Sequence, residues 1–496
     1  MTAVPWTPET AILLALVIPA LVAVGIDVTG RRPNLREAVT LVGSAALFAV
    51  VATLVPVVLA GGRPSVTLLE LLPGVPLAFR VEPLGMLFAA VASLLWPINS
   101  LYSIGYMRGN DEHGQTRFYI CFAIALASTM GIAFAGNLLT LFVFYEVLTL
   151  STYPLVAHHE DDEARRGARV YLAILLATSI GLLLPGLLWV WSVTGTLDFR
   201  AGGILDGHFD GPLVGILLFL FMFGTGKAAL MPIQRWLPAA MVAPTPVSAL
   251  LHAVAVVKAG VFTVTKVLVY VFGLEFLQGQ PSAGWLLYVA GFTVIVASVI
   301  AMRQDHLKRR LAYSTVSQLS YVTIAAAMLA PLTAVGAALH IAAHAFGKIT
   351  LFFAAGSIHT AAHKDYVSQL NGIGRRMPWT MGAFAIGTLS MIGLPPAAGF
   401  VSKWYMLMGA WTLEQWVAVG VIFASALLNA AYFLPIVYNA FFRAEDVPAH
   451  GEHADHGEAP WPVVAALAAT AALTVLLFLF PDVPIALAEQ MMGMDG

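Results

Sequence analysis

The chain has 496 residues, of which 59% are hydrophobic and only 10% are charged, and its formal net charge is −2. Because soluble domains carry about 25% charged residues, this composition indicates an integral membrane protein, and no basic tract suggests nucleic-acid binding. A single cysteine, Cys121, excludes an internal disulfide and a cysteine-based metal site.

Runs of about twenty apolar residues are long enough to cross the hydrocarbon core as a helix. The first run has no basic segment before it, so we interpret it as a first span rather than a cleaved signal peptide. The connection 61–82, with its Gly, Pro and alternating apolar residues, suits a small external hairpin. We expect an all-α membrane protein with about fourteen spans: 9–27, 38–60, 83–107, 117–135, 137–157, 168–193, 212–236, 245–272, 283–302, 311–329, 333–358, 379–412, 414–442 and 460–481.

The distribution of Lys and Arg predicts the orientation. Of the 25 such residues, 17 fall in or beside connections after odd-numbered spans, three fall after even-numbered spans, and five lie inside spans. We therefore expect the basic connections on the cytoplasmic side of a prokaryotic inner membrane and both termini on the outer face.

The stretch 224–260 contains an interrupted helix. At membrane depth such a helix survives only where its freed backbone groups are buried in protein or face water. Lys227 and Lys258 flank the interruption, and a lysine inside a span usually faces a cavity or a partner. We predict a wetted, charge-bearing path; the alternative is a loop with two snorkelling lysines, which fits Lys258 poorly. Four prolines within fifteen residues break the regular helix: Pro232, Pro238, Pro244 and Pro246.

A second interrupted helix is predicted at 393–404, where Pro395 and Pro396 break the span and Lys403 follows. Paired discontinuous helices in two halves of a chain are typical of inverted-repeat transporters. We therefore expect spans 4–8 and spans 9–13 to form inverted repeats. The predicted regions are 1–110 with the hairpin, 111–275 as the first repeat, 276–445 as the second, and 446–496 with a cytoplasmic loop and the last span.

Glu146 is the only acidic residue deep within a predicted span. A carboxylate at that depth needs a partner, water or a proton. A structural glutamate bonded to a neighbouring helix is the alternative. Five lysines lie within spans and no other acid is expected to neutralise them at depth, while Lys266, nearer the end of its span, is expected to snorkel.

His340, His344 and Lys348 are spaced by four residues, so on a helix they share one face. Histidine titrates near neutrality, and such a row suits a proton relay, beside Gly347, which permits close approach of another helix or water. Satisfied polar groups in the core are the alternative. His252, six residues before Lys258, lines a neighbouring face and could link toward Lys227.

Burial disfavours the charged form of an amine, so a changing nearby charge can expel or recover its proton. Alternating protonation along Glu146, Lys227, Lys258, the histidine row and Lys403 would move a proton laterally without covalent chemistry. The sequence has no nucleotide loop, haem motif, flavin fingerprint or Fe–S cysteine set. We therefore expect no cofactor, and we expect the energy to come from an ion gradient or from another protein of the same complex.

Two charged runs are interpreted as solvated loops. The run 158–169 needs no site, and the run 449–458 contains three histidines that could bind a metal but suit a linker better: His450, His453 and His456.

Five segments carry a resemblance to a known family: FYEVLTLSTYPLV, GKAALMPIQRWLPAAMVAPTPVSALLHAVAVVKAG, LAYSTVSQLSY, HIAAHAFGKITLFFAAG and GLPPAAGFVSKW. The chain resembles the antiporter-like membrane subunits shared by complex I and by Mrp-type multisubunit sodium/proton antiporters, from span 3 to span 13. The resemblance implies fourteen helices, broken spans 7 and 12, and a polar axis along mid-membrane. It also implies roles in proton translocation for Glu146, Lys227, Lys258, His340, His344, Lys348 and Lys403.

The wording of the motifs is most similar to the Mrp D subunit, although Gln234 and Ala239 depart from the family pattern at the turn between spans 7 and 8. The leading hypothesis is a proton-translocating antiporter subunit, not itself an enzyme, with other membrane subunits, protons, Na⁺ and the lipid bilayer as partners. A proton-pumping subunit of complex I or of a membrane-bound hydrogenase is the alternative. A membrane acyltransferase would have no use for the lysines at both breaks, and a passive scaffold does not explain six ionisable side chains that each cost about 2.5–3.5 kcal/mol on insertion scales.

Overall fold

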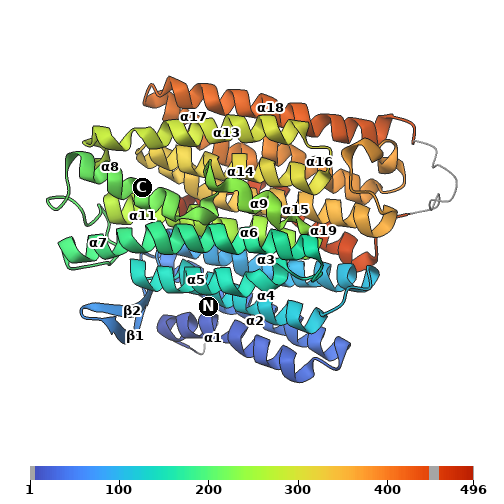
Figure 1. The fold of residues 1–496 in the computed structure, drawn as a ribbon, viewed down its shortest axis with the longest axis horizontal. Coiled ribbons are helices and arrows are strands. Elements are labelled where there is room, and N and C mark those ends of the chain that lie inside the picture. The colour runs from blue at the N-terminus through green and yellow to red at the C-terminus, as the bar shows by residue number, and fades with distance from the viewer. Residues whose placement is uncertain (1–5, 446–456, 495–496) are drawn as a thin grey trace.

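The computed structural model describes residues 6–445 and 457–494 and is a bundle of long, roughly parallel helices (Figure 1). The first part of the chain contains α1(Pro8–Thr29), α2(Pro33–Leu59), β1(Ser65–Leu72), β2(Val75–Arg80), α3(Pro83–Gly109), α4(Gln115–Ala133), α5(Leu138–Val156), α6(Asp162–Thr178), α7(Leu184–Thr194) and α8(Gly211–Gly224). The middle contains α9(Trp236–Ala239), α10(Thr245–Ala249), α11(Val256–Val267), α12(Leu274–Gln278), α13(Trp285–Arg303), α14(Leu307–Ala327) and α15(Pro331–Ala362). The last part contains α16(Pro378–Ile392), α17(Gly399–Thr412), α18(Trp416–Phe442), α19(Trp461–Leu479) and α20(Asp482–Met491).

A helix, or a pair of helices, stands at each predicted span. Within the described residues, eleven helical segments are long and apolar enough to cross a membrane. The three predicted spans outside this set are the two broken ones and 311–329, whose helix α14 is rich in Ser, Thr and Gln. The all-α membrane fold is confirmed, and the exact number of spans stays a prediction.

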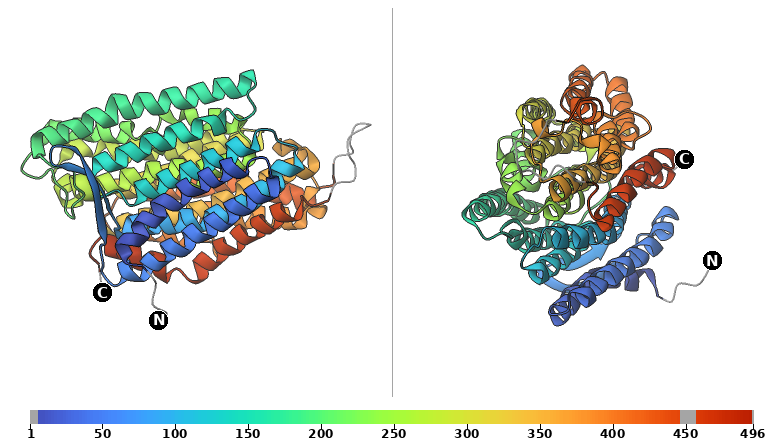
Figure 2. Two further views of the ribbon diagram at one scale, coloured as in Figure 1. Left: turned by 90° about the horizontal axis from the view of Figure 1, so that it is seen from below. Right: turned by 90° about the vertical axis from the view of Figure 1, so that its right-hand side faces the viewer.

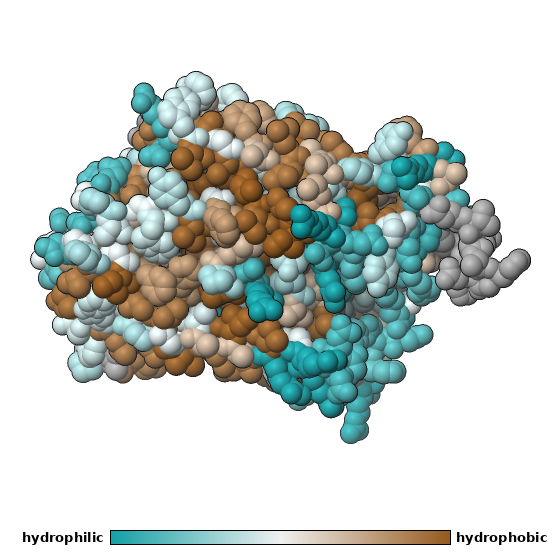
Figure 3. Space-filling model, turned by 45° about the horizontal axis from the view of Figure 1, so that its top comes forward, coloured by the Kyte–Doolittle hydropathy of each residue, from teal (hydrophilic) through white to brown (hydrophobic). Residues whose placement is uncertain are grey.

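The views along and across the bundle place the termini and the hairpin (Figure 2). The start of α1 and the end of α20 lie toward the end of the bundle that carries β1 and β2, whereas the end of α18 and the start of α19 lie at the opposite end. The strands pair antiparallel, with Ser65 opposite Arg80, so the hairpin expected at 61–82 is present. Apolar surface dominates the middle of the space-filling view, and hydrophilic surface gathers toward its right-hand end (Figure 3).

The first predicted break is present after α8. The helix ends at Gly224, and only short pieces follow before α10: 3-10 turns at Gly226–Ala228 and Ile233–Arg235, the four-residue helix α9, and a further 3-10 turn at Ala240–Val242. The indole nitrogen of Trp236 donates at 3.0 Å to the carbonyl of Gly226, which also accepts from the amide of Ala229, and so ties α9 to the first 3-10 turn. A Cβ at Gly260 of α11 would lie 2.3 Å from the carbonyl carbon of Lys227. Only glycine therefore lets α11 pack directly on the broken segment.

The second predicted break lies between α16 and α17, at 393–398. The helix α15, which faces this break, is continuous over 32 residues and almost wholly buried. A Cβ at Gly347 would lie 2.8 Å from the hydroxyl oxygen of Ser390 on α16. The close approach expected at Gly347 is therefore present, and another helix makes it.

Some details of the sequence interpretation need correction or lie outside the described residues. The charged run 158–169 is not simply a loop, because α6 begins within it at Asp162; Asp161 caps this helix by accepting from the amide of Ala164 at 2.7 Å. The helix α20 was not expected. The three histidines of the connection 449–458, His450, His453 and His456, lie outside the described residues.

Candidate functional site: a buried polar axis and a polar cavity

Lys227 is fully buried at the first break, in the 3-10 turn after α8. Its ammonium nitrogen donates to the carbonyl of Tyr145 at 2.8 Å and to the hydroxyl of Thr149 at 2.6 Å, both on α5. It also lies 3.2 Å from the centre of the Tyr145 ring, a cation–π position. The snorkelling alternative is therefore wrong for Lys227, because its charge is held inside the protein.

Glu146 lies on α5 between the two residues that bind Lys227. Within residues 6–445 and 457–494, both of its carboxylate oxygens are buried without a hydrogen-bond partner, and no ion pair joins it to Lys227. A buried carboxylate in this condition requires water, a proton or a group from another molecule. The alternative of a structural glutamate bonded to a neighbouring helix is therefore not what the structure shows.

Lys258 of α11 connects the first half of the chain with the histidine row of α15. Its ammonium nitrogen lies 2.6 Å from Nδ1 of His344, and both side chains are buried. A lysine ammonium can only donate, so a neutral His344 accepts at Nδ1 and carries its proton on Nε2. Within the described chain Nε2 of His344 has no partner. This lysine–imidazole pair can share one proton and pass it on from Nε2.

His340 occupies the next turn of α15, with its ring centre 6.0 Å from that of His344. Its Nε2 lies 3.1 Å from the side-chain oxygen of Gln318 on α14, and its Nδ1 lies 2.8 Å from the hydroxyl of Ser402 on α17. The amide nitrogen of Gln318 donates to the carbonyl of Met391 at 3.3 Å. His340 is therefore held from both sides by polar groups.

Lys403 satisfies the carbonyls that the second break sets free. Its ammonium nitrogen donates to the carbonyl of Met391 at 2.6 Å and of Ile392 at 3.3 Å, the last two residues of α16. The final carbonyls of a helix lack intrahelical partners and carry the negative end of its dipole, which suits a cation. Since Gln318 donates to the same Met391 carbonyl, Lys403 and His340 share one network.

Lys348, one turn beyond His344, begins a second branch of this network. Its ammonium nitrogen donates to the hydroxyl of Ser314 at 2.8 Å, and the hydroxyl of Tyr432 lies 3.0 Å from the same oxygen. Tyr432 also donates to Asn429, which accepts from the Gln318 amide at 3.3 Å. His340 and Lys348 of the predicted row therefore belong to one hydrogen-bonded network across five helices, α14 to α18.

The predicted axis residue His252 and the lysine expected to snorkel, Lys266, lie apart from this network. His252 is fully buried against Phe352 of α15, with ring centres 4.7 Å apart, and neither ring nitrogen has a partner among the described residues. Lys266 does not snorkel: it is fully buried, donates to the carbonyl of Ala135 at 2.8 Å and pairs with Glu82 at 3.2 Å. The expectation that Lys266 snorkels is therefore wrong, because Glu82, at the N-cap of α3, neutralises it inside the protein.

The polar residues that complete the axis were not identified from the sequence. They have ordinary helical spacing and no charge, so only their contacts reveal them: Tyr145, Thr149, Ser314, Gln318, Ser402, Asn429 and Tyr432. The motif LAYSTVSQLSY contained a usable signal, because Ser314 and Gln318 are four residues apart and therefore share one face of the helix. No cluster of three or more His, Cys, Asp or Glu side chains in the described chain is arranged to hold a metal ion.

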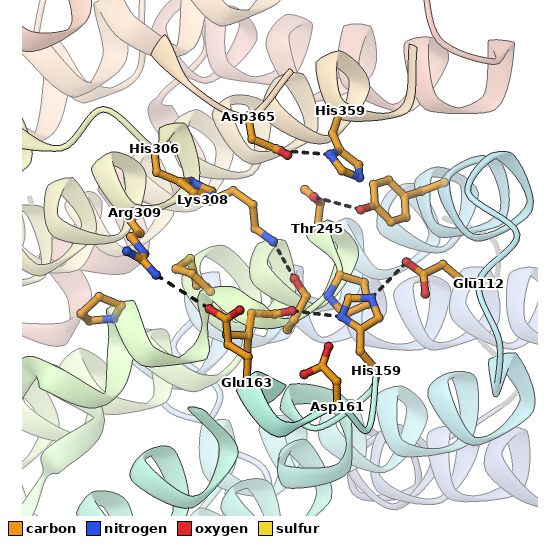
Figure 4. A pocket seen from close by; sticks show the side chains of 16 residues that line it. Glu112, His159, Asp161, Glu163, Thr245, His306, Lys308, Arg309, His359 and Asp365 are labelled. Carbon is orange, nitrogen blue, oxygen red and sulfur yellow. Dashed lines mark hydrogen bonds and ion pairs between the residues drawn. The ribbon is translucent and has the colours of Figure 1, made fainter. Parts of the chain in front are cut away.

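A polar cavity of about 290 Å³ opens at one end of the bundle, beside the first broken segment (Figure 4). Its walls come from the α3–α4 connection, the start of α6, the segment 238–245, the start of α14 and the end of α15. The cavity contains several titratable groups: Glu112, His159, Asp161, Glu163, His306, Lys308, Arg309, His359 and Asp365. Part of the run 158–169 therefore lines a cavity, contrary to the expectation that it needs no site.

The charges of the cavity are arranged in pairs. Burial raises the pKa of Glu112, but the hydrogen bonds and positive charges of His158 and His159 outweigh it and lower that pKa to about 2. The hydrogen bond to Glu112 raises the pKa of His159 above its ordinary value, against burial. On the opposite wall, the hydrogen bond from His359 at 2.9 Å lowers the pKa of Asp365.

These features together define a membrane-embedded helical bundle of the ion-translocating type, with ionisable groups held along a buried axis and two helices broken beside a lysine. The chain belongs to the family described as NADH:quinone oxidoreductase/Mrp antiporter, TM, whose model matches residues 135–429. The resemblance identified from the sequence motifs is thereby confirmed. The chain is an antiporter-like membrane subunit of Mrp or complex I type.

Relatives from both branches are similar to this chain. The N subunit of the NADH-quinone oxidoreductase of Desulforudis audaxviator (strain MP104C) is 35% identical over 73% of this chain and 71% of its own length. A probable K(+)/H(+) antiporter protein of Rhizobium meliloti (strain 1021), described as its A/B subunit, is 34% identical over 72% of this chain, which spans only 35% of that protein. The whole of that relative is therefore much longer than the part shared with this chain.

Solved structures share the fold over almost the whole chain. A chain of the Mrp complex from Dietzia sp. DQ12-45-1b matches with a TM-score of 0.86 at 21% identity, covering 98% of both chains. A chain of the membrane-bound sulfane sulfur reductase, an archaeal respiratory membrane complex, matches with a TM-score of 0.84 at 20% identity and the same coverage. At these identities the likeness concerns the fold alone.

Proposed function

We propose that this chain is the proton-translocating subunit of a multisubunit monovalent cation/proton antiporter of Mrp type, most similar to the D subunit. One observation carries the proposal: buried hydrogen bonds join Lys258 to His344, and His340 through Gln318 to the carbonyl that binds Lys403. A proton can move along such a line by exchange between amines, imidazoles and intervening waters. Ionisable groups in a span are costly and mark ion pathways.

The proposed route begins at Glu146 and Lys227 and continues through Lys258, with His252 close to it. It then follows His344, His340 and Lys348 of α15 and ends at Lys403. The broken segments at Pro232 and Pro238 and at Pro395 and Pro396 expose backbone carbonyls to this route, as at Met391. Each broken helix gives its lysine a polar setting that an unbroken span would lack.

We also propose that regions 111–275 and 276–445 are inverted repeats, each with one broken helix and a lysine beside it. The complex would lie in the inner membrane of a prokaryote, with other membrane subunits as partners and both termini outside. The placement of most Lys and Arg residues in connections after odd-numbered spans supports this orientation.

A second candidate is a redox-driven proton pump of complex I type, favoured by the 35% identity to an N subunit over 73% of this chain. The two candidates use the same axis and differ in the energy source. In the first, a cation gradient drives proton movement, whereas in the second a reductant oxidised by neighbouring subunits drives it.

The test is the collapse of ΔpH on addition of Na⁺ or K⁺ to everted vesicles that contain the whole complex. The variants are Glu146→Ala, Lys227→Ala and Lys258→Met, with Lys364→Ala, whose side chain pairs with Glu445 outside the axis, as the matched control. We expect the cation response in the wild type and the control, and its loss in the three axis variants at equal assembly.

A wild type that ignores both cations but acidifies the vesicles when given NADH or another reductant would assign the chain to the redox-driven branch. Axis variants that transport at the wild-type rate would refute the proton route itself.

A further inference from the structure

The polar cavity beside the broken segment 225–244 has no role in the axis described above. It is lined by side chains from five separate parts of the chain (Figure 4). All of these parts follow odd-numbered spans, which places the cavity on the predicted cytoplasmic side. Resting on the proposed function, we propose that this cavity is a proton-loading vestibule in which His159 holds the proton destined for the axis.

The geometry around His159 fits a protonated ring. Its Nδ1 lies 3.2 Å from the carbonyl oxygen of Val242, and its Nε2 lies 3.3 Å from a carboxylate oxygen of Glu112. Both neighbours can only accept, because the Glu112 carboxylate is ionised at neutral pH. A neutral imidazole has one nitrogen without a proton, which would then face an acceptor. The imidazolium satisfies both contacts, so the site stabilises a bound proton.

His159 is also accessible to water, as a loading group must be. Its side chain is 37% exposed, whereas that of Glu112 is 13% exposed. Near it lie the imidazole of His158, whose Nε2 is 3.6 Å from the second Glu112 oxygen, and the ammonium group of Lys308 of α14. Asp161 and Glu163 of the α6 region line the same cavity, and Glu163 lies 3.9 Å from Arg309. The carboxylates of the cavity favour a cation at its opening.

The cavity leads to the part of the chain that carries His252. Val242, which binds His159, and Ala243, whose carbonyl accepts from Lys308 at 2.6 Å, directly precede α10. Thr245 at the start of α10 lines the cavity, and His252 follows seven residues later, a rise of about 10 Å along a helix. The described chain provides no hydrogen-bond partner for either nitrogen of His252. Buried nitrogens in this state bind water or a passing proton.

Together, these contacts give an order of events. A proton from the cytoplasm binds His159 between Glu112 and Val242, moves past Thr245 to His252, and reaches the Lys258–His344 pair. His359 and Asp365 on the opposite wall form a second, similar pair at 2.9 Å. The vestibule therefore delivers protons to the axis at the Lys258–His344 pair, near the junction of the two halves of the chain.

Two measurements test this inference separately from the proposed function. The first needs no transport: Val242→Cys and, as a second position, His306→Cys, both partly exposed in the cavity wall, are made in a Cys121→Ser chain within the whole complex. A membrane-impermeant cationic methanethiosulfonate should modify both cysteines in everted vesicles but neither in right-side-out vesicles. Ser402→Cys, deep in the axis, is the control that should stay unmodified in both. Modification from the other side, or from neither side, would overturn the vestibule.

The second measurement is the dependence of the initial transport rate on the pH outside everted vesicles. In Glu112→Gln the negative charge that favours protonated His159 is gone. The midpoint of the pH dependence should therefore shift toward acid by about one pH unit, the lower end of the effect of an opposite charge at this distance. His159→Gln should remove this pH dependence of the transport rate. Glu70→Gln, on the hairpin, should leave the midpoint at the wild-type pH.

A purely structural role of Glu112 would lower the amount of complex or the maximal rate without moving the midpoint, and that result would overturn the role of His159. If the wild type does not respond to cations or to reductants, the proposed function fails. The cysteine labelling would still decide whether the cavity is an aqueous vestibule on the cytoplasmic side.

Discussion

The two broken helices place their lysines in contrasting surroundings. At the first break, Lys227 donates to a carbonyl and a hydroxyl of another helix, α5, which also carries Glu146, a carboxylate without a hydrogen-bond partner in the described part of the chain. At the second break, Lys403 donates to the end of the helix that precedes it in the same span, α16. An acid lies near the first lysine, whereas imidazole, amide and hydroxyl groups surround the second.

This contrast indicates two ways to hold a charge inside a membrane protein. Near Lys227 a nearby opposite charge can change the stability of the ammonium when Glu146 gains or loses a proton. Near Lys403 the helix dipole and the freed carbonyls stabilise the ammonium, and relay groups reach it through Gln318. Charge movement in the first half should therefore depend on Glu146, and in the second half on the hydrogen-bonded network.

The largest effect should come from replacing each of these lysines by arginine. Arginine keeps the positive charge but does not lose its proton in proteins. If both lysines must titrate, Lys227→Arg and Lys403→Arg should each reduce cation-dependent ΔpH collapse at least about 100-fold, the low end for removal of a proton-transferring group. The measurement is the initial rate per assembled complex, with Lys364→Arg as control.

An active Lys403→Arg beside an inactive Lys227→Arg would sharpen the contrast. It would mean that the second lysine acts as a fixed charge on the end of α16, and that only the first carries a proton.

The next effect concerns stability and a lysine outside both breaks. Glu82→Gln leaves Lys266 buried without its counter-charge, and breaking a buried ion pair costs about 3–5 kcal/mol. We expect a clear fall in the melting temperature of the complex, largely reversed in Glu82→Gln/Lys266→Met, which removes both charges. Glu160→Gln, which breaks the exposed pair with Arg117, should have no measurable effect. A destabilised double variant would contradict the assignment of the effect to this pair.

A smaller effect should follow from removing the amide that joins His340 to the carbonyl beside Lys403. Gln318→Leu preserves approximate size and removes contacts to His340, Met391 and Asn429. Loss of one hydrogen-bonded step, at about 1.4 kcal/mol per tenfold change, should slow transport about tenfold without preventing assembly. Gln318→Glu, which restores an acceptor for His340, should recover part of the rate, whereas equal rates for Gln318→Leu and wild type would exclude Gln318 from the route.

The sequence predicted the fold and the charged members of the axis for a clear physical reason. Lysine, glutamate and histidine are so costly in apolar spans that position alone marks Lys227, Lys258 and Glu146. Gln318 and Tyr432 carry no such cost, so only three-dimensional contacts reveal them. Proline spacing located both breaks, since proline forbids regular helix.

The polar cavity could not be predicted for a different reason. Charged residues in connections are ordinary solvated groups, and sequence separation hides their proximity: Glu112 and His159 are 47 residues apart, and His359 lies on a third element. The prediction that Lys266 snorkels was wrong for a related reason. Its partner Glu82 lies 184 positions earlier in the sequence and just outside a predicted span.

The smallest predicted effect is a pH-dependent change in stability at the Glu112–His159 contact. The pKa of Glu112 is lowered from 4.5 to about 2, so its contribution is complete above about pH 4.5 and is lost as the pH falls toward 2. The pKa of His159 is raised from 6.5, so its contribution is complete below about pH 6.5 and is lost as the pH rises through the raised value. The contact should therefore stabilise the complex most between about pH 4.5 and 6.5.

Thermal unfolding of wild type and Glu112→Gln at pH 5.5 and pH 9 measures this contribution. The variant should lower the melting temperature more at pH 5.5 than at pH 9, because His159 is charged only at the lower pH. The difference should be smaller than for Glu82→Gln, since the His159 side chain is 37% exposed and solvent screens its charge. By contrast, the side chains of Lys266 and Glu82 are only 0% and 7% exposed, so solvent screens their charges much less. A larger loss at pH 9 would mean that Glu112 stabilises the protein through contacts other than the charge on His159.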